Sequence, residues 1–237
     1  MAELRLTERA RRIRELLDPQ GIKHAALPRP VILEFTGSPD AGKTTLIDIF
    51  DPFFRRLDFQ VERPQEGAEV VRHIPRTGPE YNVRTGIYQL GLVLDAMHDR
   101  RTDLLILDRG LYDPWCWMEY WVRKGKIDQP TARAYQRFFT DPRWRSAVDI
   151  CFFTVCDPEE AIRRNSKALP EDVLGETTNP ESIRLLVDIA REAHRFWQRR
   201  GAPVVLVDTT GVEPRQVAAM LLDRTLAMLE ERLGAVS

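Results

Sequence analysis

The stretch that most constrains the fold of this chain runs from residue 37 to residue 45 and reads Gly37-Ser38-Pro39-Asp40-Ala41-Gly42-Lys43-Thr44-Thr45. It fits the pattern G-x-x-x-x-G-K-[ST], follows an apolar run at 31–35 and precedes a helical pattern at 43–56. Glycines let the backbone turn sharply with its N–H groups pointing inward, and a helix start attracts phosphate. We therefore expect a strand, a phosphate-binding loop and a helix in succession.

The side chains of this loop predict a bound nucleoside triphosphate. Lys43 is expected to reach the β- and γ-phosphates, and the Thr44 hydroxyl is expected to bind Mg²⁺. Asp40 places a carboxylate beside the phosphates, which is unfavourable unless a cation or an acceptor substrate meets it. The structural alternative is a glycine turn that carries a surface lysine.

Apolar runs alternate with helical patterns along the rest of the chain. The expected strands are 31–35, 58–62, 104–107, 148–155 and 204–207, and breakers make 64–79 a loop. Asp157 and Asn179 are each followed by proline and glutamate, which is typical of a helix start. Five strands separated by helices predict an α/β fold: a five-stranded parallel sheet with helices on both faces. Ligands of such sheets bind beyond the carboxyl ends of the strands.

The strand at 104–107 is followed by Asp108 and Arg109. An aspartate at the end of a strand beside the phosphate loop is expected to be the second anchor for Mg²⁺. Arginine is poorly suited to deprotonate water but well suited to grip phosphate, which favours transfer to a bound acceptor over hydrolysis. A surface ion pair at a strand end is the alternative interpretation.

Four segments resemble the thymidylate kinase-like and deoxynucleoside kinase-like group of P-loop kinases. They are TGSPDAGKTT, VERPQEG after the second strand, LLILDRGLYD after the third, and AIRRNSK before a segment rich in proline and glycine. The resemblance implies an ATP- and Mg²⁺-dependent kinase whose Asp108 strand lies beside the loop strand. It also implies an acceptor pocket at the ends of strands two and three, with Glu62 as a candidate base and Arg63 as a candidate ligand of an acceptor phosphate.

A lid is expected near 163–180, because AIRRNSK supplies Arg163, Arg164 and Lys167 ahead of a flexible stretch. Arg163 and Arg164 are assigned to catalysis and Lys167 to the nucleotide. The structural alternative is a helix end with favourable cations, which does not exclude a lid.

The resemblance also suggests contacts to the acceptor and to the adenine. Arg72 and Arg76 flank the loop before the long helix and are assigned to the acceptor, and Thr210 follows the last strand and is assigned to the nucleotide. Trp117 shares a helix face with Trp121. Aromatic stripes are usually core, and stacking of Trp117 on a planar acceptor is the functional alternative.

Two departures from the family pattern leave the acceptor open. Thr36 stands where thymidylate kinases carry glutamate or glycine, and Gly110 stands where deoxynucleoside kinases often carry serine.

Composition sets the remaining expectations. The 237 residues are divided into an N-terminal helical extension at 1–29 and a kinase domain at 30–237. The extension is expected to be an amphipathic helix with Leu4, Ile13, Leu16 and Leu17 on or near one side. Cys116, Cys151 and Cys156 are unsuited to a zinc site and indicate a reducing, cytoplasmic compartment.

Partners and function classes follow from the same observations. A net charge of −1 does not favour nucleic acid, no stretch is apolar enough to span a membrane, and a homodimer stays open. The leading hypothesis is transfer of phosphoryl from ATP to a nucleoside, nucleotide or similar small molecule. The alternatives are a kinase for another hydroxyl, on a polynucleotide end, a modified DNA base, an antibiotic or a sugar, and a regulatory nucleotide switch.

Overall fold

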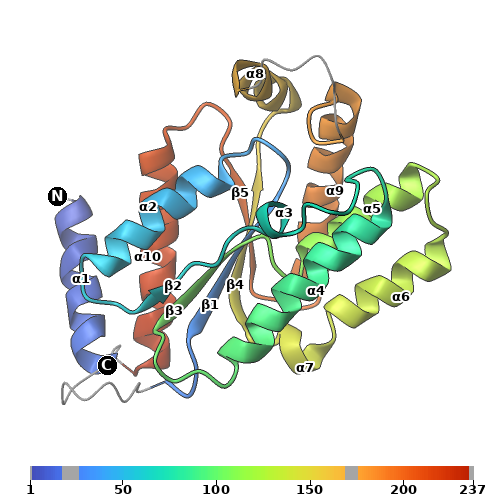
Figure 1. Cartoon of the computed structure of the whole chain (residues 1–237). Coiled ribbons are helices and arrows are strands. Elements are labelled where there is room, and N and C mark those ends of the chain that lie inside the picture. The colour runs from blue at the N-terminus through green and yellow to red at the C-terminus, as the bar shows by residue number, and fades with distance from the viewer. Residues whose placement is uncertain (1, 18–26, 169–175, 235–237) are drawn as a thin grey trace.

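A computed structural model of the chain describes residues 2–17, 27–168 and 176–234 (Figure 1). The described residues form one parallel sheet in the order β2-β3-β1-β4-β5. Its strands are β1 (Val31–Gly37), β2 (Val61–Glu62), β3 (Leu104–Asp108), β4 (Val148–Val155) and β5 (Val204–Asp208). The predicted five-stranded parallel sheet is confirmed, and β3 lies directly beside β1, as expected.

Helices cover both faces of the sheet (Figure 1). One face packs against α1 (Ala2–Leu17), α2 (Lys43–Arg55) and α10 (Pro214–Arg232), and the other packs against α4 (Pro79–Ala96), α5 (Asp113–Arg123) and α9 (Pro180–Gln198). The remaining helices are α3 (Gly67–Val70), α6 (Gln129–Phe139), α7 (Pro142–Arg145) and α8 (Pro158–Ala168).

The central strands are buried along nearly their whole length, as apolar runs in a doubly covered sheet should be. Because alternate side chains of a strand point to opposite faces, β1 supplies both cores. Leu33 and Phe35 pack toward α2 and α10, and Ile32 packs toward α4 and α5. Glu34 is the exception in this strand, since it is a carboxylic acid with no exposed surface.

Helix α1 packs on α10 through Leu6, Ala10, Ile13 and Leu17. These positions recur at the spacing of one helix face, whereas Leu4 and Leu16 fall outside it and are 67% and 38% exposed. Of the four residues that the sequence placed on or near one side, only Ile13 and Leu17 are therefore on the buried face.

Several boundaries differ from the sequence prediction for local reasons. β2 is only two residues long, because the chain turns at Asp58, which has φ 62°, before it reaches the sheet. The single helical turns α3 and α7 are too short to give a periodic pattern. Both predicted helix starts are confirmed. The Asp157 carboxylate accepts from the amides of Glu159 and Glu160, and the Asn179 side chain accepts from that of Glu181.

The register of the sheet brings several strand ends together. Phe35 of β1 is level with Asp108 of β3, and Gly37 is level with Thr154 of β4. The carboxyl end of β1 therefore lies between two polar strand ends, where the residues that follow can converge. Within the described ranges, every helix is too short or too polar to cross a lipid bilayer.

Candidate nucleotide and acceptor site

The loop between β1 and α2 is held in a conformation that glycine permits. Gly37 has φ 122°, and a Cβ placed on it would lie 2.0 Å from the Thr154 carbonyl oxygen. Gly42 has φ 82° and caps the start of α2 with open space beside it. The Ser38 amide donates to the Thr154 carbonyl over 3.0 Å, which fastens the loop to β4. The first residues of α2 are thus aimed at the space above the sheet.

Lys43 lies almost wholly inside the protein, with 7% of its surface exposed. Its Nζ donates to the Ser38 carbonyl oxygen over 2.6 Å, so the ammonium closes the loop on itself. Burial lowers the pKa of Lys43 to about 8, and the Arg109 guanidinium adds to that effect against the opposing pull of Asp108 and Asp113. A bound polyphosphate would restore the balance by supplying negative charge.

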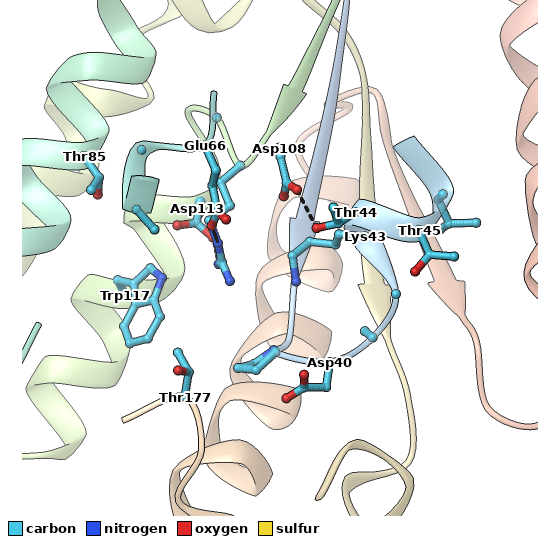
Figure 2. A pocket seen from close by; sticks show the side chains of 18 of the residues that line it. Asp40, Lys43, Thr44, Thr45, Glu66, Thr85, Asp108, Asp113, Trp117 and Thr177 are labelled. Carbon is cyan, nitrogen blue, oxygen red and sulfur yellow. Dashed lines mark hydrogen bonds and ion pairs between the residues drawn. The ribbon is translucent and has the colours of Figure 1, made fainter. Parts of the chain in front are cut away.

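Thr44 and Asp108 form the second feature of the site. The Thr44 hydroxyl donates to the Asp108 carboxylate over 2.7 Å (Figure 2). Burial raises the pKa of Asp108, and the Lys43 ammonium counteracts the rise. Among the described residues, no group of three or more acidic, histidine or cysteine side chains is arranged to hold a metal ion. A hydroxyl and a carboxylate still fit Mg²⁺, since this ion takes hard oxygen ligands and keeps several of its waters.

Arg109 lies at the centre of an ion-pair cluster. It has φ 67°, and its amide donates to the Phe35 carbonyl oxygen over 2.8 Å. Its guanidinium donates to Glu66 over 2.8 Å and to Asp113 over 2.6 Å. The Asp113 carboxylate also accepts from the Thr36 hydroxyl at 3.2 Å. Burial lowers the pKa of Arg109, but Asp113, Glu66 and Asp108 outweigh it and raise the pKa overall.

These groups face one cavity of about 860 Å³ (Figure 2). We call one side the donor half; it is lined by residues 39–46, Asp108, Arg164, Thr209 and residues of the segment leading into α10. We call the other side the acceptor half. It is lined by Glu66, Gly67, Ala68, Arg76, Tyr81, Asn82, Thr85, Gly86, Gln89, Arg109, Gly110, Asp113, Pro114, Trp117, Glu176, Thr177 and Thr178.

Polar groups without partners mark the acceptor half. Among the described residues, the Tyr81 hydroxyl and the side-chain amide oxygen (Oε1) of Gln89 are buried and have no hydrogen-bond partner. Trp117 borders the same space, whereas Trp121 is fully buried and donates to Asn82 over 2.8 Å. Both tryptophans therefore belong to the core, and Trp117 also borders the cavity.

Arg164 of α8 lines the donor half and hydrogen-bonds to the phosphate loop. Its guanidinium donates to the carbonyl oxygens of Asp40 and Thr209, both at 3.2 Å, and its Nε donates to Glu160 at 3.0 Å. The Thr209 hydroxyl in turn donates to the Ala41 carbonyl over 3.1 Å. Arg164 thus ties α8 to the phosphate loop.

Many of the sequence-predicted site residues line the cavity. They are Pro39, Asp40, Ala41, Gly42, Lys43, Thr44, Thr45, Arg76, Asp108, Arg109, Trp117 and Arg164. Gly37 and Ser38 do not line the cavity. They fix the conformation of the phosphate loop at its start.

Other predicted residues lie elsewhere, and each has a local reason. Glu62 is exposed, and Arg63 pairs with Asp48 at 2.8 Å. Arg72 donates to the Glu69 carbonyl. Arg163 is paired with Glu160 and is 57% exposed, and Thr210 donates to Asp208 at 2.5 Å. The expected pocket position of Glu62 and Arg63 is corrected: the chain leaves the sheet at Glu62, and Glu66 reaches the cavity instead.

Some expectations fall outside the described residues. The Lys167 side chain is among them, as are residues 169–175 of the expected lid. Sequence analysis also missed Glu66 and Asp113. Both lie within the quoted segments VERPQEG and LLILDRGLYD. Asp113 follows Arg109 by four residues, a spacing that could have suggested the pair, whereas no local pattern marks Glu66 as a partner of Arg109.

Comparisons with known proteins support the fold. No family model and no curated protein matches the sequence. The structure is similar to that of M. mycoides deoxyadenosine kinase with bound dATP, at 18% identity and a TM-score of 0.59, over 82% of this chain and 98% of that one. The same enzyme with bound dCTP gives 15% identity and a TM-score of 0.56, over 83% and 100%. Thymidylate kinase from Candida albicans gives 15% and 0.56, over 85% and 94%.

These identities are low, so the likeness concerns the fold. It confirms that the chain has the fold of the nucleoside and nucleotide kinases that its motifs resemble.

Proposed function

We propose that this protein is a kinase that transfers the terminal phosphoryl group of ATP, with Mg²⁺, to a hydroxyl group of a small acceptor such as a nucleoside. The observation that carries the proposal is a single cavity with two chemically distinct halves. Lys43, Thr44 and Asp108 face one half, and the Glu66–Arg109–Asp113 cluster faces the other.

The donor half suits a magnesium-bound triphosphate. Loop amides and the Lys43 ammonium would bind the phosphates, while Thr44 and Asp108 would hold Mg²⁺ directly or through water. When bound, the metal supplies positive charge where the phosphates develop negative charge. Little covalent chemistry is required of the protein in such a transfer, because positioning and charge stabilisation dominate.

The acceptor half favours a ligand without a phosphate of its own. Glu66, Asp113 and Glu176 line it against the two guanidinium groups of Arg76 and Arg109, which gives a formal charge of −1. Arg109 is already engaged by two carboxylates, and Arg63 and Arg72 lie outside the described lining. A phosphomonoester would meet repulsion there, whereas a neutral acceptor would not.

Glu66 is the side chain best suited to accept the proton of an acceptor hydroxyl. Its carboxylate faces the cavity, and Arg109 fixes its orientation. General-base assistance of this kind contributes about 10²–10⁴-fold. The Trp117 ring and the unpartnered Tyr81 and Gln89 groups would hold a planar, polar acceptor in reach of Glu66.

The test is ATP turnover measured with Mg²⁺ alone and then with nucleosides and their monophosphates. Turnover is expected to be slow alone, to accelerate with a nucleoside and to respond weakly to a monophosphate. Glu66→Gln should lower kcat by about 100-fold with ATP binding retained. Glu69→Gln is the matched control, because Glu69 is exposed on the same short helix.

Two outcomes contradict parts of this proposal. Hydrolysis that no acceptor accelerates would favour a nucleotide switch over a kinase. A monophosphate used better than its nucleoside would overturn the assignment of a neutral acceptor.

A further inference from the structure

Glu34 is a buried carboxylate that makes no contact needed for phosphate binding, so its position in β1 requires another explanation. Glu34 lies in the middle of β1 with no exposed surface, three residues before Gly37. Its two oxygens accept from different backbone amides, from Leu111 over 2.9 Å and from Tyr112 over 3.0 Å. Tyr112 is the N-cap of α5 and Leu111 comes directly before it, so neither amide has a partner within the helix. A carboxylate is favoured at that end of a helix.

Gly110 makes room for this carboxylate. A Cβ placed on Gly110 would lie 2.5 Å from Glu34 Oε2, 2.6 Å from its Cδ and 2.9 Å from its Cγ. A side chain at position 110 would therefore displace the Glu34 carboxyl or the turn itself. The glycine at 110 and the glutamate at 34 form one structural unit.

The turn that Glu34 holds delivers two residues of the acceptor half. Arg109 adopts φ 67°, and its amide donates to the Phe35 carbonyl over 2.8 Å. The turn is thus fastened to β1 at 109 by Phe35 and at 111 and 112 by Glu34. Arg109 leaves this turn toward Glu66, and Asp113, the first residue of α5, meets the same guanidinium.

Burying a carboxylate is unfavourable, and an apolar residue at 34 would avoid that. It would also leave two buried amides without acceptors, at about 1–3 kcal/mol each. We propose that Glu34 is a positioning residue, which fixes the turn at 109–112 so that Arg109 and Asp113 stand in the acceptor half. The catalytic part of this inference rests on the proposed kinase function, whereas the geometric part does not.

The ionisation of Glu34 offers a readout that a passive core residue lacks. Burial and the nearby Asp113 raise the pKa of Glu34 to about 8, and the amide hydrogen bonds oppose them. The other titratable groups that face it are Tyr112, Cys116 and Cys151, and burial raises the pKa of each, so they stay neutral near pH 8. Both oxygens accept most strongly in the carboxylate, so the turn should be held best above pH 8.

The experiment compares Glu34→Gln with the wild type across pH, in the presence of ATP, Mg²⁺ and the acceptor. At pH 9 the variant should lose about 100-fold in kcat with KM for ATP unchanged, since misplacing a catalytic group by an ångström costs about that much. The loss should shrink as the pH falls through about 8. Equal kcat for both proteins at pH 9 would overturn the inference. Gly91→Ala is the control for substitution as such, because nothing lies within 4 Å of a Cβ there.

A double-mutant cycle tests the Glu34–Gly110 unit separately. Gly110→Ala should lower kcat and the melting temperature in the wild type and should have little further effect once Glu34→Ala has removed the carboxyl. Additive effects would contradict the unit.

The two proposals can fail separately. A wild type that no acceptor accelerates would defeat the kinase proposal alone. A crystal structure of Glu34→Gln then decides the inference: loss of the Arg109 contacts to Glu66 and Asp113 supports it, and unchanged contacts reject it.

Discussion

The donor and acceptor halves of the cavity are assembled in different ways. Most of the donor half comes from one stretch, residues 39–46, joined by Asp108 from the neighbouring strand. The acceptor half draws its side chains from the segment after β2, from α4, from the start of α5 and from residues 176–178 (Figure 2). The donor half works with backbone amides and one ammonium, whereas the acceptor half depends on two ion pairs of Arg109, one with the nearby Asp113 and one with the distant Glu66.

This difference implies that the two halves respond differently to substitution. Substitutions in the donor half should abolish ATP binding or turnover. Changes in the acceptor half should spare ATP binding and affect transfer.

The largest effect is expected at Lys43. Lys43→Ala should lower acceptor-dependent turnover by about 1,000-fold, because a preorganised positive group at the developing charge is lost. Steady-state ADP formation measures it, and Lys126→Ala, at an exposed lysine, is the control. Retention of turnover in Lys43→Ala would remove the distinction between the halves.

The next effect concerns the stability of the donor loop. Gly37→Ala should lower the free energy of unfolding by several kcal/mol, because its Cβ would meet the Thr154 carbonyl at a φ of 122°. Gly42→Ala should cost only about 1 kcal/mol, since φ is strained but the space is open. Urea denaturation of the two variants checks this order, and equal costs would mean that the contact with β4 does not hold the loop.

A smaller effect should appear in the pH dependence of stability. The folded pKa of Glu34 is about 8, above its unfolded value of 4.5, so the folded state binds more protons between these values. The contribution of Glu34 to stability is therefore present below pH 4.5 and is lost as the pH rises through 8. Glu34→Gln should remove this part of the slope in melting temperature against pH. The same slope in both proteins would show that the carboxyl titrates at an ordinary pKa.

The smallest effect is expected in ATP binding, which should take up less than one proton per site. The pKa of Lys43 is about 8 without phosphate, and a bound triphosphate should raise it. ATP binding at pH 8.5 should therefore take up protons, and binding at pH 6.5 should not. Calorimetry in two buffers of different ionisation enthalpy detects the uptake. A null result at pH 8.5 would show that Lys43 is already fully protonated there.

How well each half of the cavity could be predicted from the sequence depends on whether its residues are close together in the chain. The sheet, its parallel strands and the phosphate loop could be predicted, because apolar runs and glycine spacing act over neighbouring residues. Glu62 and Arg63 were predicted to face the acceptor pocket, but Glu66 lines it instead. The reason is that β2 ends at Glu62 and the chain continues to Glu66 before it meets Arg109. Glu34 gave no local signal, since its role exists only once β1 and the start of α5 are side by side. Asp113 lies four residues after Arg109, so its ion pair is local.

By itself the sequence determined the α/β sheet and the phosphate loop, because strand burial, helix starts and a glycine turn are set by side chains a few positions apart. Only the tertiary structure decided which charges meet in the acceptor half. The Glu66–Arg109 ion pair joins residues 43 positions apart, and the Glu34–Tyr112 hydrogen bond that supports the same turn joins residues 78 positions apart. A carboxylate selects its partner by distance in space, and that distance is fixed by the packing of the sheet and its helices.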